Sequence, residues 1–246
     1  MELNILFPVL NEHLRLERGI RTTVEYVRAH LNVPCHLTIL DNGSDDDTPR
    51  IGRKLAREYP EVTYERIEER GVGVAFRHGV ELNNADIVGY MDIDLSTDIS
   101  TLSEMLRIFR DNPQIQYVNA SRFADRSDTR GRKWYRRITS KGLLILLKAV
   151  FGMRATDAIC GFTFVRREIA ERLVNECGDD KGWFYMIEFL LRAERDGIDI
   201  LDLPVNWTED YNTTVHIWKT IRNYLRNIIR LKRTFILEEK KNAQKN

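Results

Sequence analysis

The stretch YMDIDLSTD, residues 90–98, places three aspartates within seven positions at the end of an apolar run. Asp92 and Asp94 are two residues apart, so their side chains point to the same side of an extended strand. Two carboxylates aimed at one place repel each other unless a cation lies between them or one is protonated. Hard oxygen ligands select Mg²⁺ or Mn²⁺, which often bind one or two carboxylates together with a ligand's phosphate oxygens. Asp92 and Asp94 are therefore candidate metal ligands, whereas the position of Asp98 is typical of a helix cap.

Two further polar stretches follow apolar runs earlier in the chain. LNILFPVL ends at Asn11 and Glu12, and CHLTIL is followed by DNGSDDDT at 41–48. The second stretch is also a good turn and helix N-cap, which leaves a purely structural interpretation open. If the runs are parallel strands, their ends converge on one edge of a sheet, and this convergence favours a binding site.

Strand-like and helix-like patterns alternate along the chain. We expect strands at 3–10, 35–41, 62–68 and 85–94, and helices at 15–31, 48–59, 73–83 and 99–112. Further helices are expected at 136–152, 182–197 and 216–237, with strands near 118–123, 158–168 and 198–207. This alternation predicts an α/β fold with a mainly parallel sheet and helices on both faces. The expected organisation is one domain over 1–215, followed by a basic amphipathic helix and a frayed tail over 216–246.

Composition excludes several classes of protein. The 246 residues carry 38 basic and 37 acidic side chains, which argues against a dedicated nucleic-acid partner. The three cysteines form no C-x-x-C pair and have no histidines at zinc-ligand spacing, so they are expected to be reduced thiols of a cytoplasmic protein. No signal peptide or membrane-spanning segment is expected. The glycine-rich GVGVAFRHG has Phe76 in place of a third glycine, so it does not fit a dinucleotide fingerprint; Gly71 and Gly73 are expected to make a tight turn beside a nucleotide.

An ordered set of motifs resembles the inverting nucleotide-sugar glycosyltransferases of the GT-A fold. The set consists of FPVLNE, ILDNGSDDDT, RGVGVAFRHGVELNNADIVGYMDIDLS, ASRF, DAICGFTFVRRE and LPVNW, and it covers roughly residues 3–210. The second half is most similar to the dolichyl- or polyprenyl-phosphate mannose or glucose synthases. The resemblance implies a metal-dependent hexosyltransferase with a nucleotide-sugar donor, GDP- or UDP-linked, and Mg²⁺ or Mn²⁺ as cofactor.

The resemblance assigns roles to the residues that match its donor motifs. Pro8, Asn11 and Glu12 match the motif that holds the nucleoside, and Asp41 matches an acid near the ribose and base. Asp92 and Asp94 match the aspartates that bind the metal and the diphosphate. Ser96 stands where the synthases often have Gln, which leaves the third protein ligand of the metal open.

The acceptor side of the expected site is less regular. Arg122 matches an arginine near the phosphates, and Asp157 is the candidate general base or a structural cap. After LPVNW the chain has TEDYNTTVHIW instead of the basic clamp of the synthases, so His216 is a candidate metal ligand or an ordinary polar residue at a helix start. Lys219 and Arg222 are alternative replacements for the clamp.

The resemblance leaves two acceptors open. A polyprenyl phosphate is already an anion and needs no general base, whereas a saccharide hydroxyl, as in surface polysaccharide or glycolipid synthesis, would use one. The expected helices at 136–152 and 216–237 mix large apolar residues with Arg and Lys, which is typical of helices at an anionic membrane surface. Peripheral attachment to the cytoplasmic face of a membrane, directly or through a membrane-protein partner, is therefore expected; the alternative is that these helices pack in the core or an interface. A nucleotidyltransferase and a non-catalytic scaffold are further alternatives, but the glycine-rich first loop of the former is absent.

Overall fold

The computed structural model describes residues 1–131, 134–209 and 217–244. The chain divides into two compact units, one formed by Met1–Arg132 with Ala155–Glu209 and the other by Lys133–Arg154 with Asp210–Asn246. The boundary expected after residue 215 lies outside the described residues.

The first unit is built on a seven-stranded sheet in the order β3-β2-β1-β4-β7-β5-β8. Its strands are β1 (Leu3–Val9), β2 (Cys35–Asp41), β3 (Val62–Arg66), β4 (Ile87–Met91), β5 (Tyr117–Ser121), β7 (Phe162–Arg166) and β8 (Ile200–Pro204). Six of them run parallel, and β7 is antiparallel to both of its neighbours, β4 and β5. The predicted mainly parallel α/β fold is confirmed.

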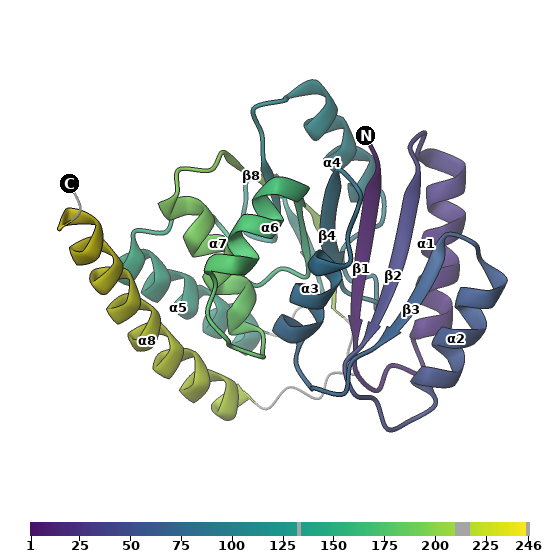
Figure 1. Cartoon of the computed structure of the whole chain (residues 1–246), viewed down its shortest axis with the longest axis horizontal. Coiled ribbons are helices and arrows are strands. Elements are labelled where there is room, and N and C mark those ends of the chain that lie inside the picture. Colours follow the sequence, from purple (N-terminus) through teal and green to yellow (C-terminus); the bar gives the residue numbers. More distant parts are fainter. Residues whose placement is uncertain (132–133, 210–216, 245–246) are drawn as a thin grey trace. The chain divides into compact units, whose positions relative to one another are not determined.

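Helices cover both faces of this sheet (Figure 1). They are α1 (Leu16–His30), α2 (Thr48–Glu58), α3 (Val72–Glu81), α4 (Thr101–Asp111), α6 (Arg167–Glu176) and α7 (Phe184–Arg195). The central strand β1 is buried on both faces, which explains why all of its residues except Asn4 are apolar.

The two faces have separate cores. On one face, alternate side chains of β1 such as Ile5 and Phe7 pack with apolar residues of α1, α2 and α4. On the other face, Phe76 of α3 packs edge-on against Tyr90 of β4 and Phe189 of α7. These cores hold the strands rigidly, so the loops that follow the strands start from fixed positions.

A small second sheet pairs β6 (Asp128–Arg130) with β9 (Asn206–Thr208) in parallel. β6 was not predicted, because it has only three residues and no hydrophobic alternation, and the single strand expected near 198–207 is divided into β8 and β9.

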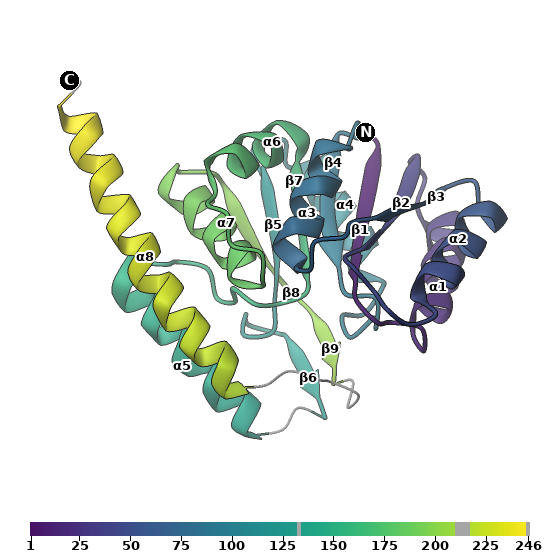
Figure 2. The same ribbon diagram turned by 60° about the horizontal axis from the view of Figure 1, so that its bottom comes forward.

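The second unit contains α5 (Trp134–Phe151) and α8 (Ile217–Ala243), which lie side by side (Figures 1 and 2). The ring of Phe151 meets the ring of Phe235 edge-on, with 5.8 Å between their centroids. Within the described ranges, no helix has both the length and the apolar character needed to cross a bilayer.

Candidate active site

The sheet order brings three polar strand ends to one edge. β1 lies between β2 and β4 and runs parallel to both, so the residues that follow Val9, Asp41 and Met91 emerge at the same side. This is the edge at which parallel sheets bind ligands. Pro8 stays within β1, where it pairs with Leu40.

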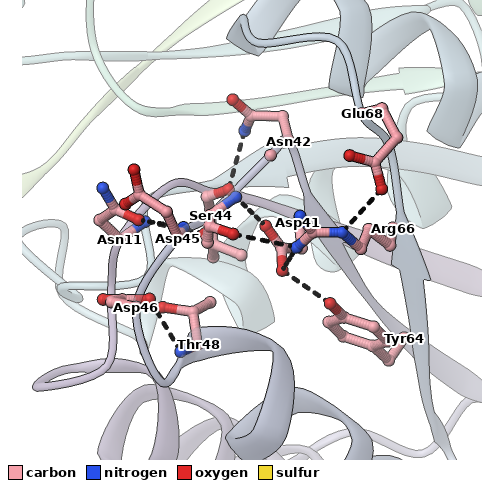
Figure 3. Close-up of polar contacts among 12 residues, drawn as sticks. Asn11, Asp41, Asn42, Ser44, Asp45, Asp46, Thr48, Tyr64, Arg66 and Glu68 are labelled. Carbon is pink, nitrogen blue, oxygen red and sulfur yellow. Dashed lines mark hydrogen bonds and ion pairs between the residues drawn. The ribbon is translucent and has the colours of Figure 1, made fainter.

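The loop after β1 is fastened to the loop after β2. Asn11 has a left-handed backbone, with φ of 57°, and its amide N–H donates to the hydroxyl of Ser44 at 2.9 Å. Its side-chain oxygen accepts from the amide of Asp45 at 2.9 Å, and the amide of Glu12 donates to Thr48 Oγ1 at 2.8 Å. Figure 3 shows Asn11, Ser44 and Asp45 together. Because each loop satisfies the polar groups of the other, their shape is set before any ligand arrives.

Asp41 ends β2 with a fully buried carboxylate (Figure 3). Its Oδ1 accepts from the amide of Ser44 at 2.8 Å, and its Oδ2 accepts from the hydroxyl of Tyr64 at 2.6 Å and from Arg66 at 3.3 Å. Burial, followed by the hydrogen bond to Asp41, raises the pKa of Tyr64 to about 12. Three donors thus hold a buried negative charge where the resemblance places the ribose and base.

The carboxylate of Glu12 pairs with Arg15, which lies three residues later in the chain. Arg15 donates to both of its carboxylate oxygens, from Nε at 2.6 Å and from a terminal nitrogen at 2.9 Å. Such a two-point pair fixes both side chains.

Asp92 and Asp94 follow β4 in a tight turn. The amide of Asp92 donates to the carbonyl of Gly161 at 2.9 Å, and one oxygen of Asp94 accepts from the amide of Ser96 at 2.9 Å. Leu95, which lies between Asp94 and Ser96, has a left-handed backbone with φ of 56°. The two aspartates predicted to act together are therefore held in one turn.

Asp92 is unfavourable as a carboxylate. Desolvation, followed by the like charge of Asp94, raises its pKa to about 8, and Arg122 opposes that shift only in part. Asp92 retains partial contact with solvent, yet the neighbouring Asp94 disfavours a negative charge on the Asp92 carboxyl. A bound cation would remove this penalty.

The arrangement fits a metal that is shared with a ligand. Among the described residues, no three His, Cys, Asp or Glu side chains are grouped so that they could hold an ion. Mg²⁺ commonly uses one or two carboxylates and takes its remaining ligands from water and substrate phosphates. Asp92 and Asp94 match that mode and do not form a complete protein cage. The other predicted ligand, His216, lies outside the described residues.

Arg122 and Asp157 form a buried ion pair beside these aspartates. Arg122 Nε donates to Asp157 Oδ2 at 2.7 Å, and a terminal nitrogen donates to Oδ1 at 3.0 Å. The amides of Arg122 and Ile159 donate to the same carboxylate at 3.2 and 3.0 Å. Burial alone would lower the pKa of Arg122, but the charge and hydrogen bonds of Asp157 outweigh it and raise that pKa. The guanidinium carbon also lies 5.5 Å from the centre of the Trp207 ring.

A polar network supports this pair from behind. Asn119 donates to the carbonyl of Asp157 and to the carboxylate of Asp202, each at 2.8 Å. Thr156 donates to Asp202 from its amide at 2.6 Å and from its hydroxyl at 2.8 Å. The chain around Asp157 is thereby tied to β5 and β8.

A family model described as glycosyl transferase family 2 matches residues 4–174, which is more than two thirds of the chain. The chain belongs to glycosyl transferase family 2. The predicted family is thus confirmed.

Among the curated relatives of this family 2 chain are proteins whose names contain dolichyl phosphate or polyprenol. Glycosyltransferase AglD of Haloferax volcanii is 29% identical over 232 residues, which is 94% of this chain but 37% of that protein. Dolichyl-phosphate beta-glucosyltransferase of Dictyostelium discoideum is 22% identical over 96% of this chain and 75% of that protein. Polyprenol monophosphomannose synthase of Mycolicibacterium smegmatis is 26% identical over 83% of this chain and 77% of that protein.

Solved structures confirm the fold. Glucosyl-3-phosphoglycerate synthase of Mycobacterium tuberculosis, in complex with Mn²⁺, UDP-glucose and phosphoglyceric acid, matches with a TM-score of 0.69 and 18% identity. The match covers 94% of this chain and 79% of that one.

The glycine turn at Gly71 and Gly73 lies against the loop between α6 and α7. Gly71, with φ of 142°, donates its amide to Asn42 Oδ1 at 3.1 Å, which places it beside the end of β2. A Cβ at Gly71 would lie 1.9 Å from the carbonyl oxygen of Lys181, and one at Gly73 would lie 2.7 Å from that of Asp180. The loop between α6 and α7 therefore occupies the space next to both glycines, and its close approach requires them.

Sequence reasoning missed four residues that shape the site. Tyr64 and Arg66 lie two apart on β3 and so share a face, which is a signal that could have paired them with Asp41 on the neighbouring strand. Arg15 stands three residues after Glu12, a spacing that favours ion pairs in helical turns. Gly161 gave no local signal.

Proposed function

We propose that the protein is a metal-dependent inverting glycosyltransferase that moves a hexose from a GDP- or UDP-linked donor to a polyprenyl phosphate. The observation that supports this most directly is the turn that holds Asp92 and Asp94 beside the Arg122–Asp157 pair. The names of the dolichyl-phosphate and polyprenol relatives support the same acceptor class.

The donor half of the proposal rests on the loops after β1 and β2. The carboxylate of Asp41 is fully buried and held by Tyr64, Arg66 and Ser44, so it would fix these three residues around the base and ribose, and a direct hydrogen bond from the ligand would require one of the covering side chains to move. Asn11 fixes the loop that would pass along the nucleoside. Glu12 contributes by orienting Arg15, and the pair contributes to the charge balance near Asp92.

Charge is the basis of the proposed reaction. When the bond between the anomeric carbon and the diphosphate breaks, negative charge develops on the leaving group and positive character on the sugar. A divalent ion held by Asp92 and Asp94 would neutralise part of the leaving-group charge. The guanidinium of Arg122 stays positive beside them and would stabilise the same charge. The acceptor then attacks from the opposite face and inverts the anomeric configuration.

The role proposed for Asp157 favours a phosphate acceptor. Both of its oxygens already accept from Arg122, and one of them also accepts from the amide of Ile159. A carboxylate used in this way is a poor general base, because taking a proton would break its pairing with a buried arginine. We therefore propose that Asp157 positions Arg122. A hydroxyl acceptor would need a base, whereas a lipid phosphate does not. A lipid-linked acceptor also places the enzyme at a membrane surface, and we propose the cytoplasmic face.

The direct test is a screen of nucleotide sugars with a short-chain polyprenyl phosphate, with and without Mn²⁺. We expect a product that partitions into organic solvent and is cleaved by mild acid, as a sugar phosphodiester of a polyprenol should be. A product that is stable to mild acid, or transfer only to a free saccharide, would favour the hydroxyl-acceptor alternative. Absence of nucleotide binding would contradict the donor half of the proposal.

A second test addresses how the metal binds. Because the described residues supply only a partial ligand set, Mn²⁺ should bind weakly to the protein alone and much more tightly with a nucleoside diphosphate. Titration calorimetry with Mn²⁺, UDP and GDP in both orders measures this coupling. Tight binding of Mn²⁺ without nucleotide would show that the protein itself completes the site.

A further inference from the structure

The large apolar side chains exposed on the described surface are concentrated on two helices. Of the twelve, seven belong to α5 and α8: Trp134, Ile138, Ile145, Leu225, Ile229, Ile236 and Leu237. Trp134 and Ile145 expose 74% and 68% of their surface, which is unusual for residues of this size. Clustered exposure of this kind marks a binding surface.

The exposed residues of the two helices repeat one spacing. On α5, Trp134, Ile138 and Ile145 are separated by four and then seven residues, and the exposed Lys141 completes the pattern seven residues after Trp134. Residues at such intervals lie on one face of a helix. The helix α5 therefore presents a narrow apolar stripe formed by these residues.

On α8 the same pattern is formed by Leu225, Ile229 and Ile236, and the exposed Lys232 occupies the position that Lys141 has on α5. The ammonium of Lys232 lies 5.9 Å from the centre of the Phe151 ring of α5, so Lys232 stands at the edge of the contact between the helices. Lys141 can lay its methylene groups on the apolar surface and keep its ammonium in water or among headgroups.

The apolar members of the two stripes are exposed, and other side chains of α5 and α8 are the buried ones. The buried side chains of α5 are Ser140, Leu144 and Leu147, and those of α8 include Ile228, Leu231 and Phe235. At 3.6 residues per turn, Leu144 lies about 80° and Leu147 about 140° around the helix from Trp134, so neither belongs to the stripe that begins there. The two helices therefore use other faces for their buried contacts, and the apolar residues of the stripes stay exposed.

The charge of α5 and α8 indicates what kind of surface these helices bind. α5 carries four basic residues and no acidic one, and α8 carries eight basic residues and two acidic ones. The whole chain has 38 basic and 37 acidic residues, so the remainder is net negative. Positive charge is gathered on the same two helices that expose apolar side chains, which is the composition of helices that lie in an anionic membrane interface.

We propose that the stripes of α5 and α8, with their flanking lysines and arginines, form a docking surface for an anionic lipid bilayer. The purpose of this surface rests on the proposed function, because a polyprenyl-phosphate acceptor stays in the membrane. Pairing of the same surface with a second copy of the chain would bring like charges together, which disfavours that occupant.

Flotation of the full-length protein with lipid vesicles tests the proposal. One set of vesicles is pure phosphatidylcholine, and the other contains one third phosphatidylglycerol. We expect binding to the anionic vesicles, weaker binding to the neutral ones, and release at high salt. Equal binding to both sets, or to neither, would contradict the proposal.

Paired variants separate the apolar and basic contributions. Ile145→Asp combined with Ile229→Asp should weaken vesicle binding by about tenfold or more, because interfacial affinity scales with inserted apolar area. Lys141→Glu combined with Lys148→Glu should abolish the preference for anionic lipid. Leu82→Asp, at an exposed leucine directly after α3, is the matched control and should bind as the wild type does. Unchanged binding of the stripe variant would overturn the proposal.

Failure of docking and failure of the proposed function give different results. Nucleotide binding and donor hydrolysis are measured on the same variants without vesicles, and both should be unchanged in the stripe variant. Flotation without nucleotide binding would remove the proposed function and leave the docking surface. A wild-type dimer that the stripe variant dissociates, without flotation, would assign the stripes to self-association instead.

Discussion

The carboxyl group of Asp92 occupies the place that a side chain at Gly161 would need. A Cβ built on Gly161 would lie 1.7 Å from Asp92 Oδ2 and 2.1 Å from its carboxyl carbon. The two residues are also joined by a backbone hydrogen bond of 2.9 Å. Gly161 thus determines where the first aspartate of the proposed metal site can point.

Gly161→Ala should therefore remove metal-dependent transfer while the protein still folds. The new methyl group must displace the Asp92 carboxyl, and a misplaced metal ligand should lower kcat/KM by about a hundredfold or more. Steady-state kinetics at saturating Mn²⁺ measures the loss. Gly142→Ala is the control, since a Cβ there meets nothing within 4 Å. Normal activity of Gly161→Ala would show that the carboxyl position is not critical.

Asp94→Ala should abolish metal-dependent turnover and leave the fold intact. The change removes one of two carboxylates that the proposed ion needs, whereas Asp98→Ala, in the same cluster, should keep near-normal kcat. The comparison requires activity assays with Mn²⁺ and with excess chelator, together with circular dichroism of both variants. Full activity of Asp94→Ala, or of the wild type in chelator, would contradict the metal-dependent mechanism.

Asp92→Asn should stabilise the metal-free protein while it inactivates the enzyme. The pKa of Asp92 is raised to about 8, so the folded state holds a proton that the unfolded state loses near pH 4. Wild-type stability should therefore fall as pH rises from about 4 to about 8, and this contribution should be absent in the variant. Urea unfolding at several pH values in chelator gives the difference, which should exceed about 1 kcal/mol at pH 8. A variant less stable than wild type at that pH would show that the carboxylate is favourably paired.

Arg122→Lys should reduce kcat by about a hundredfold, because an ammonium cannot reproduce the two-point pairing with Asp157. If Asp157 acts only by positioning Arg122, Asp157→Asn should lower kcat and leave the pH of half-maximal kcat unchanged. The double variant should then be little worse than either single one. Disappearance of the acidic limb of the pH profile in Asp157→Asn alone would restore the general-base role.

The fold could be predicted from the sequence because its signals are local. Runs such as LNILFPVL and helices with clear periodicity determine the element types, and parallel order follows from their alternation. Asp92 and Asp94 were expected together at the end of an extended strand, but β4 ends at Met91 and the two aspartates lie in the turn that follows it.

The remaining features depend on contacts distant in the sequence. Asp92 and Gly161 meet only because β7 inserts between β4 and β5 in the antiparallel direction. Glu12 was expected to contact the nucleoside, but in the structure its carboxylate pairs with Arg15. Several basic residues could have been its partner, and sequence spacing alone does not decide between them. The exposed stripe of α8 was visible as a mixture of apolar and basic residues, but which face stays exposed depends on packing.

The central position of β7 has a consequence for how activity is acquired during folding. β1, β2, β3 and β4 are contiguous in the first part of the chain and can pair with one another as soon as they are made. β7 is synthesised after both of the strands it separates, and it brings Gly161 to Asp92 over a long loop whose closure is slow. The half of the sheet that we assign to the nucleotide can therefore form early, whereas the catalytic half is completed by one of the last strands to join. A nascent chain that ends before residue 162 would leave β4 as an open edge, and chaperone protection should be most needed at that stage.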